Sequence, residues 1–148
     1  MTHIEYFKLQ AKNLLKDYKT KMPSTDDYLY EYAPTYFDID AIILAYDVDE
    51  DDFSLMKAQH IIALIVGFKK WADLLNASEI ELELAKLLFN NQDKVYVDDW
   101  EMYITGIERD NNTTFDHESK LEILKQVFLN GKFASSFQDY RLVRRPYE

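Results

Sequence analysis

Apolar side chains recur at spacings of three and four residues in one segment after another of this chain. Between residues 4 and 18 the repeating positions are Ile4, Phe7, Ala11, Leu14, Leu15 and Tyr18. This spacing matches the 3.6-residue turn of an α-helix, so it predicts an amphipathic helix that ends before Pro23. Residues 36–46 could form either a helix or a strand, because periodicity alone does not distinguish the two in a short apolar run.

Residues that favour helix starts divide the rest of the chain into short segments. The expected caps are Ser24 or Thr25 for residues 26–32, Ser54 for residues 55–66, Ser78 with Glu81 for residues 79–89, and Asp98 with Glu101 for residues 98–109. A last long helix is expected from about Asp116 to Leu129, with Gly131 at its end and a further short helix in the tail.

These patterns predict an all-α protein with a single compact domain of six or seven short helices over residues 1–148. The length suits one domain, and no internal repeat occurs at a fixed period. Apolar residues make up 47% of the chain, while Gly and Pro number three each, so the composition favours a packed core over a loop-rich chain.

Several classes of protein are excluded by what the chain lacks. Without Cys it can form neither disulfides nor thiolate metal sites, and it has no thiol nucleophile. Its three glycines, at 67, 106 and 131, cannot supply a P-loop, a Rossmann glycine set or a G-x-S-x-G elbow. The longest apolar run, residues 61–66, is far shorter than the roughly 20 residues of a membrane span, and no signal peptide is recognisable, so we expect a cytoplasmic protein without membrane partners.

Charge is distributed unevenly along the chain. Residues 1–22 hold five Lys and two acids, a balance of +3, whereas residues 23–56 hold ten acids and no Lys or Arg, a balance of −10. One interpretation is that the basic first helix packs near the acidic segment. The other is an acidic docking face for a basic partner, in which interleaved Tyr side chains supply contact area. A protein that mimics DNA would be a special case of this second interpretation. The net charge of −10 argues against direct nucleic-acid binding.

Other candidate sites are weaker. An EF-hand loop starting at Asp47 would have Asp52 at position 6 and Ala58 at position 12, where that motif needs Gly and Glu. His60 lies on a largely apolar helix and is expected to be a partly buried core residue, whereas His117 is expected to be exposed. Residues 59–76 have the outline of a helix-turn-helix, but a structural helical hairpin is favoured because the chain is acidic.

Two stretches carry a family resemblance. The matching positions are Ala11, Lys12, Leu14 and Leu15, then Ala58, Gln59, Ala63, Gly67, Phe68, Trp71 and Leu74. They resemble a small helical module found beside glyoxalase-superfamily and ankyrin-repeat proteins in bacteria, with the pattern AK-x-L followed by AQ…A…GF-x-x-W-x-x-L. The resemblance covers residues 1–78, apart from an acidic insertion at 23–56, and residues 79–148 add C-terminal helices. It implies a bacterial helical fold and is nearly silent on activity, so we transfer no enzymatic activity from it.

We therefore expect a non-catalytic protein of the interaction, inhibitor or immunity type that binds a basic protein, without cofactor or metal. The residues expected to bind the partner are Asp26, Asp27, Tyr28, Glu31, Asp38, Asp40, Asp47, Asp49, Glu50, Asp51 and Asp52. The alternatives are a small carboxylate-based or divalent-cation-dependent enzyme, with the cation near residues 47–52, and a purely structural module. An enzyme would need a concave pocket with shifted carboxylate pKa values.

Overall fold

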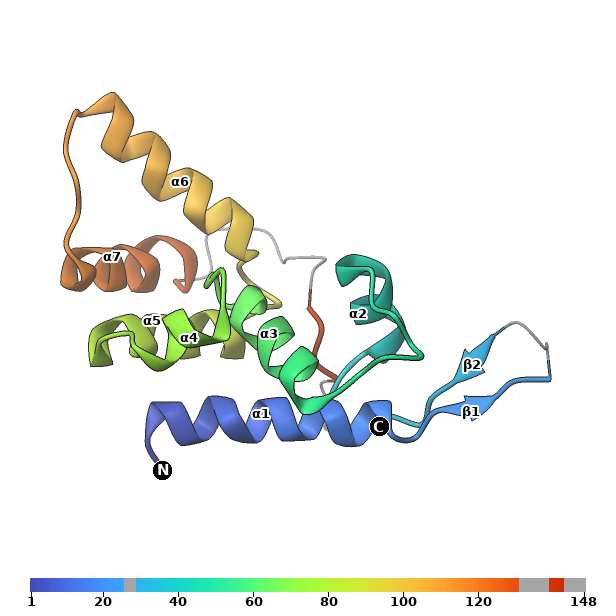
Figure 1. Cartoon of the computed structure of the whole chain (residues 1–148). Coiled ribbons are helices and arrows are strands. Elements are labelled where there is room, and N and C mark those ends of the chain that lie inside the picture. Colours follow the sequence, from blue (N-terminus) through green and yellow to red (C-terminus); the bar gives the residue numbers. More distant parts are fainter. Residues whose placement is uncertain (26–28, 131–138, 143–148) are drawn as a thin grey trace. The chain divides into compact units, whose positions relative to one another are not determined.

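The computed structural model describes residues 1–25, 29–130 and 139–142, and is mostly helical, as predicted. The described residues form seven α-helices, one π-helical turn and a two-stranded hairpin (Figure 1). Within this part of the chain every helix is too short or too polar to span a bilayer.

The chain divides by its internal contacts into two compact units, which are described separately. The N-terminal unit comprises Glu5–Ile62 with Tyr140–Glu148, and the C-terminal unit comprises Met1–Ile4 with Ala63–Asp139. The expectation of a single domain stays a prediction.

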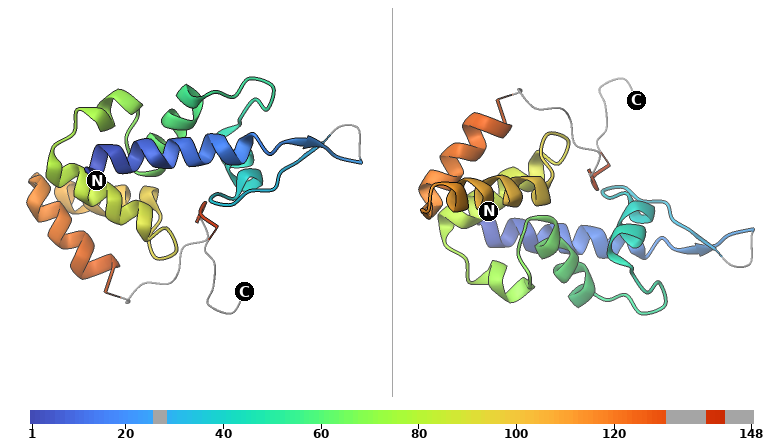
Figure 2. Two further views of the ribbon diagram at one scale, coloured as in Figure 1. Left: turned by 90° about the horizontal axis from the view of Figure 1, so that it is seen from below. Right: turned by 90° about the horizontal axis from the view of Figure 1, so that it is seen from above.

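The N-terminal unit contains most of α1 (His3–Tyr18), and this helix confirms the first prediction from periodicity. Phe7, Ala11 and Leu14 are fully buried along one side of it. A hairpin follows, in which β1 (Met22–Pro23) pairs antiparallel with β2 (Tyr30–Glu31). Both views of Figure 2 show this hairpin continuing from the C-terminal end of α1.

The predicted helix over residues 26–32 is wrong where the structure describes it, because Tyr30 and Glu31 lie in a strand. Ser24 does not cap a helix; its backbone N–H donates to the carbonyl of Leu29 at 3.1 Å, which adds a bond between the two arms of the hairpin. The alternation of Tyr30 and Tyr32 has the two-residue period of a strand, and aromatic residues favour strands. Residues 26–28 lie outside the described part.

Asp17 fixes the chain that follows the hairpin. Its carboxylate is buried and accepts three backbone N–H groups, from Thr35 at 2.9 Å, Tyr36 at 2.7 Å and Phe37 at 2.8 Å. Phe37 also forms an antiparallel bridge with Arg141. A charged acceptor in the last turn of α1 therefore holds residues 35–37 in an extended conformation.

Two further helices belong wholly or largely to this unit. In α2 (Ile39–Tyr46) the Asp38 carboxylate accepts the N–H of Ala41, and Asp47 ends the helix at φ 50°. This confirms the helical alternative for the run that periodicity left open. The start of α3 (Leu55–Ile65) confirms the Ser54 cap, whose hydroxyl accepts the N–H of Lys57 at 3.3 Å.

The C-terminal unit is built from α4 (Trp71–Leu75), α5 (Glu79–Asn90), α6 (Val97–Asp110) and α7 (His117–Ile123). Its core is a cluster of Leu88, Val95, Trp100, Ile104, Leu124 and Phe128. The rings of Trp100 and Phe128 meet edge to face with centroids 5.6 Å apart. Such a pair adds to the stability gained from burial alone.

The helix starts in this unit only partly match the predictions. Ser78 and Glu81 form the predicted capping box. The predicted pair of Asp98 and Glu101 is wrong, because α6 begins at Val97 and the N-cap position falls on Tyr96. Asp98 instead lies in the first turn, where a negative charge suits the helix dipole.

The last helix is not one continuous α-helix. It is α-helical from His117 to Ile123 and continues as a π-helical turn, η1 (Leu124–Phe128), that places Leu124 and Phe128 in the core. The predicted end at Gly131 lies outside the described residues, as does most of the tail.

Candidate functional site

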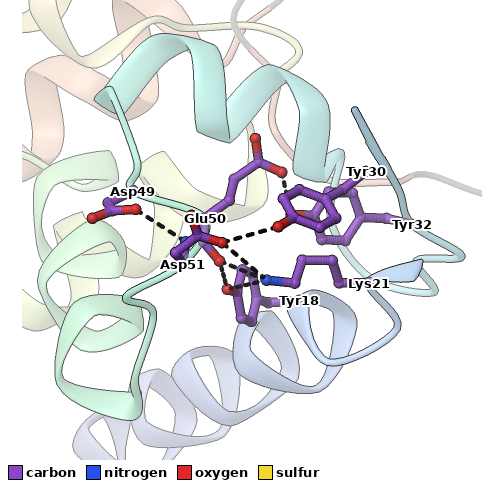
Figure 3. Close-up of polar contacts among 7 residues, drawn as sticks. All are labelled: Tyr18, Lys21, Tyr30, Tyr32, Asp49, Glu50 and Asp51. Atoms are coloured by element: carbon purple, nitrogen blue, oxygen red, sulfur yellow. Dashed lines mark hydrogen bonds and ion pairs between the residues drawn. The ribbon is translucent and has the colours of Figure 1, made fainter. Parts of the chain in front are cut away.

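The loop that follows α2, residues 47–52, carries five of the predicted site residues and contacts the end of α1 and the hairpin (Figure 3). The Tyr32 hydroxyl donates to Glu50 Oε2 at 2.6 Å, and the Tyr30 hydroxyl donates to Asp51 Oδ1 at 3.0 Å. Lys21 donates from Nζ to the backbone carbonyl of Glu50 at 2.8 Å. Lys21, Tyr30 and Tyr32 therefore anchor this acidic loop, and the Tyr18 hydroxyl adds a further bond to it.

Lys21 lies between aromatic rings. Its Nζ is 4.4 Å from the ring centroid of Tyr30 and 5.2 Å from that of Tyr18. It also donates to the Tyr18 hydroxyl at 3.2 Å, and this hydroxyl donates in turn to the carbonyl of Glu50. The hydrogen bond to Tyr18 is the main reason that the pKa of Lys21 is raised. Lys21 is therefore a permanent cation at neutral pH.

The two tyrosines that donate to carboxylates of the loop, Tyr30 and Tyr32, stay protonated. Burial, followed by the hydrogen bond to Glu50, raises the pKa of Tyr32. The hydrogen bond to Asp51 raises the pKa of Tyr30. Both hydroxyls therefore act as donors to carboxylates, and neither is an activated phenolate nucleophile at neutral pH.

The remaining predicted site residues fall into three groups. Asp38 and Asp49 have local structural roles: Asp38 caps α2, and Asp49 Oδ1 accepts the N–H of Asp51 at 3.0 Å. Four acids form no side-chain hydrogen bond or ion pair with any residue that the structure describes: Glu31, Asp40, Asp47 and Asp52. Asp26, Asp27 and Tyr28 lie outside the described residues.

The basic first segment neutralises little of this charge. Of its five lysines, Lys21 is the one that reaches an acid in the described part of the chain, and its Nζ is 4.0 Å from Asp51 Oδ1. Lys8, Lys12, Lys16 and Lys19 are exposed. Even Asp51 keeps 77% of its side chain exposed. We call the exposed carboxylates of Asp40, Asp47, Asp49, Asp51 and Asp52 the acidic face.

The C-terminal unit contains a pocket that the sequence analysis missed. It has a volume of about 420 Å³ and is lined mainly by α5 and α6, with contributions from residues 66–69 and from α7. Its ionisable lining residues are Lys69, Glu81, Glu101, Glu108, His117 and Lys120. We call this the α5–α6 pocket. The sequence contained one signal for this pocket. Glu101, Thr105 and Glu108 follow the i, i+4, i+7 spacing of one helix face, beside the apolar Trp100 and Ile104.

Glu101 has the most perturbed environment in this pocket. Burial, followed by the negative charge of Asp98, raises its pKa, and the charge of Lys69 opposes the shift. The carboxylate lies against the bare backbone of Gly67, where a Cβ atom would be 2.8 Å from Glu101 Oε1. Gly67 has φ +93°, which confirms its predicted left-handed position after α3.

The histidines do not form a metal site in the described residues. The prediction that His60 is partly buried is wrong, because its side chain is exposed on α3. His117 is exposed, as predicted, with Nε2 3.5 Å from Glu81 Oε1. Across the described ranges, no three His, Asp or Glu side chains are grouped as metal ligands.

Comparison with known proteins gives no match: no family model, curated protein or solved structure matches this chain. The resemblance to the bacterial helical module stays a prediction.

Proposed function

We propose that this protein binds a basic protein partner through the acidic face, without catalysing a reaction. The observation that carries the proposal is that the exposed carboxylates of this face outnumber the cations of the same chain that pair with them. Lys21 is the one cation within ion-pair distance of these acids in the described part of the chain. A surface with such an excess attracts a basic partner over several ångströms and favours its approach in one orientation.

The apolar surroundings of the acidic face support a protein partner over a simple cation. Leu44 on α2 is 85% exposed and lies four residues after Asp40 and three before Asp47. In the hairpin, Met22 and Leu29 are each 61% exposed, and Tyr30 is 36% exposed. Apolar and aromatic side chains beside charges supply the contact area that an interface needs at its centre.

The test compares two variants that each remove four negative charges. The face variant carries Asp40→Asn, Asp47→Asn, Asp49→Asn and Asp52→Asn. The control variant carries Asp73→Asn, Asp99→Asn, Asp110→Asn and Glu118→Gln, all exposed positions of the C-terminal unit. Each protein is used to capture partners from nuclease-treated lysate of the source cells at low and high salt.

We expect the wild type and the control variant to retain a basic protein at low salt, and the face variant to lose it. Equal loss in both variants would show that only net charge matters. Equal retention in both would show that the acidic face is not the binding surface. Either result contradicts the proposal.

The rival hypothesis, a small carboxylate-based or divalent-cation-dependent enzyme, stays a prediction. The feature that bears on it is the α5–α6 pocket, because a concave site with a perturbed carboxylate is where small molecules bind.

A further inference from the structure

The α5–α6 pocket combines an apolar wall with three carboxylates, of which Glu101 is the one without a partner among the described residues. Leu84 and Leu88 on α5 and Trp100 and Ile104 on α6 line it with apolar atoms. Glu101, next to Trp100 on α6, places its carboxylate in the same cavity. A cavity of about 420 Å³ is within the usual range for small-molecule sites, which combine apolar walls with a few polar groups.

The other carboxylates of the pocket already have partners. Glu81 lies 3.5 Å from His117 and also accepts the N–H of Ser78 in the capping box of α5. Glu108 Oε2 accepts the N–H of Phe115 at 2.8 Å. These two acids help to build the walls of the cavity.

Glu101 differs from them. Its carboxylate forms no hydrogen bond with any residue in the described ranges, and no Lys, Arg or His there lies within ion-pair distance of it. Lys69 is close enough to oppose the rise in its pKa but does not pair with it. Glu101 lies at an exposed position of α6, so its carboxylate is accessible to a ligand, and no cation of the described ranges is paired with it.

We propose that the α5–α6 pocket binds a small organic cation, an amine or guanidine on a short apolar stem, with the cationic group on the Glu101 carboxylate and the stem against Leu84, Leu88 and Ile104. The cation would supply the partner that Glu101 lacks. Three carboxylates line the pocket, Glu81, Glu101 and Glu108, against two lysines, Lys69 and Lys120, so its charge favours a cation over an anion. This site is independent of the acidic face, because all of its residues belong to the C-terminal unit.

The chain has three glycines, so their amide signals can be followed individually in a binding test by ¹H–¹⁵N NMR on the full chain. Gly67 lines the pocket, whereas Gly106 does not. The probes are phenethylammonium, its neutral analogue 2-phenylethanol and its anionic analogue 3-phenylpropionate, at constant ionic strength. We expect phenethylammonium to shift the Gly67 amide and the Trp100 indole saturably with a Kd of about 1 mM. The neutral and anionic analogues should bind at least about tenfold more weakly.

The variant Glu101→Gln keeps the size of the side chain and removes its charge, and we expect it to raise the Kd for phenethylammonium about tenfold or more. The control, Glu118→Gln, removes the same charge from an exposed position of α7 that does not line the pocket and should leave the Kd unchanged. Absence of a saturable shift at Gly67, equal or tighter binding of 3-phenylpropionate, or an unchanged Kd in Glu101→Gln would each overturn the proposal. The comparison of the three probes on the wild type tests it even if the variant fails to fold.

Discussion

At the scale of single residues, Asp17 is an acid with a structural role that its sequence context does not reveal. It lies in the charged first segment like any solvated acid, yet it is buried and accepts three backbone N–H groups from residues 35–37. Hydrogen-bond partners eighteen to twenty residues away cannot be inferred from local spacing. Lys8, Lys12 and Lys16 lie on α1, whereas Lys19 and Lys21 follow its end, and nothing local indicated that Lys21 would be the one to reach the acidic loop.

We predict that Asp17→Ala lowers the free energy of unfolding by about 3 kcal/mol or more, because it leaves three backbone donors without their charged acceptor. Urea unfolding followed by circular dichroism measures the change. Asp40→Ala, an exposed acid of the same unit, is the control and should change the stability by no more than about 0.5 kcal/mol. If the two variants were equally stable, the Asp17 hydrogen bonds would contribute little.

Glu101 contributes to folding stability with a pH dependence opposite to that of most carboxylates, whose pKa is lowered by folding. Its pKa is raised in the folded state, mainly by burial and then by Asp98, so folding favours its protonated form. The associated stability is present below the unfolded pKa of about 4.3 and is lost as the pH rises through the folded pKa. We expect Glu101→Gln to be more stable than the wild type at pH 7 and equally stable at pH 3. Thermal unfolding at the two pH values tests this, and a variant less stable at pH 7 would contradict it.

At the scale of elements, local capping signals correctly predicted two of the four expected helix caps. The capping box of Ser78 and Glu81 is formed as expected, and Ser54 caps α3. Errors arose where distant contacts decide the local structure. The strand at Tyr30 and Glu31 depends on pairing with residues 22–23, and the π-helical turn at residues 124–128 accompanies the packing of Phe128 on Trp100.

The capping box itself can be tested. Ser78→Ala removes the hydroxyl that accepts the N–H of Glu81 at 3.2 Å, and we expect it to destabilise the protein by about 1 kcal/mol. Thr114→Ala, at an exposed position between α6 and α7, is the control and should change the stability by less than about 0.5 kcal/mol. Chemical denaturation measures both, and an unaffected Ser78→Ala variant would show that water replaces the cap without loss.

At the scale of the whole molecule, charge segregation was readable from the sequence, whereas its neutralisation was not. Ten acids without a basic residue between positions 23 and 56 indicated an acidic surface. The structure shows that Lys21 and the tyrosines form hydrogen bonds with Glu50 and with one oxygen of Asp51, and that Asp38 caps α2. The α5–α6 pocket was not predicted, because its lining comes from four separate segments of the C-terminal unit.

The central claim is that the acidic face attracts its partner by charge, and the most direct test is the salt dependence of the association rate. The partner captured with the wild type is mixed with the wild type, the face variant and the control variant over a range of ionic strengths. Electrostatic steering predicts that the association rate constant of the wild type and of the control variant falls steeply with added salt, whereas the face variant associates at least about tenfold more slowly at low salt and responds little to salt. The same salt dependence in all three proteins would contradict the account.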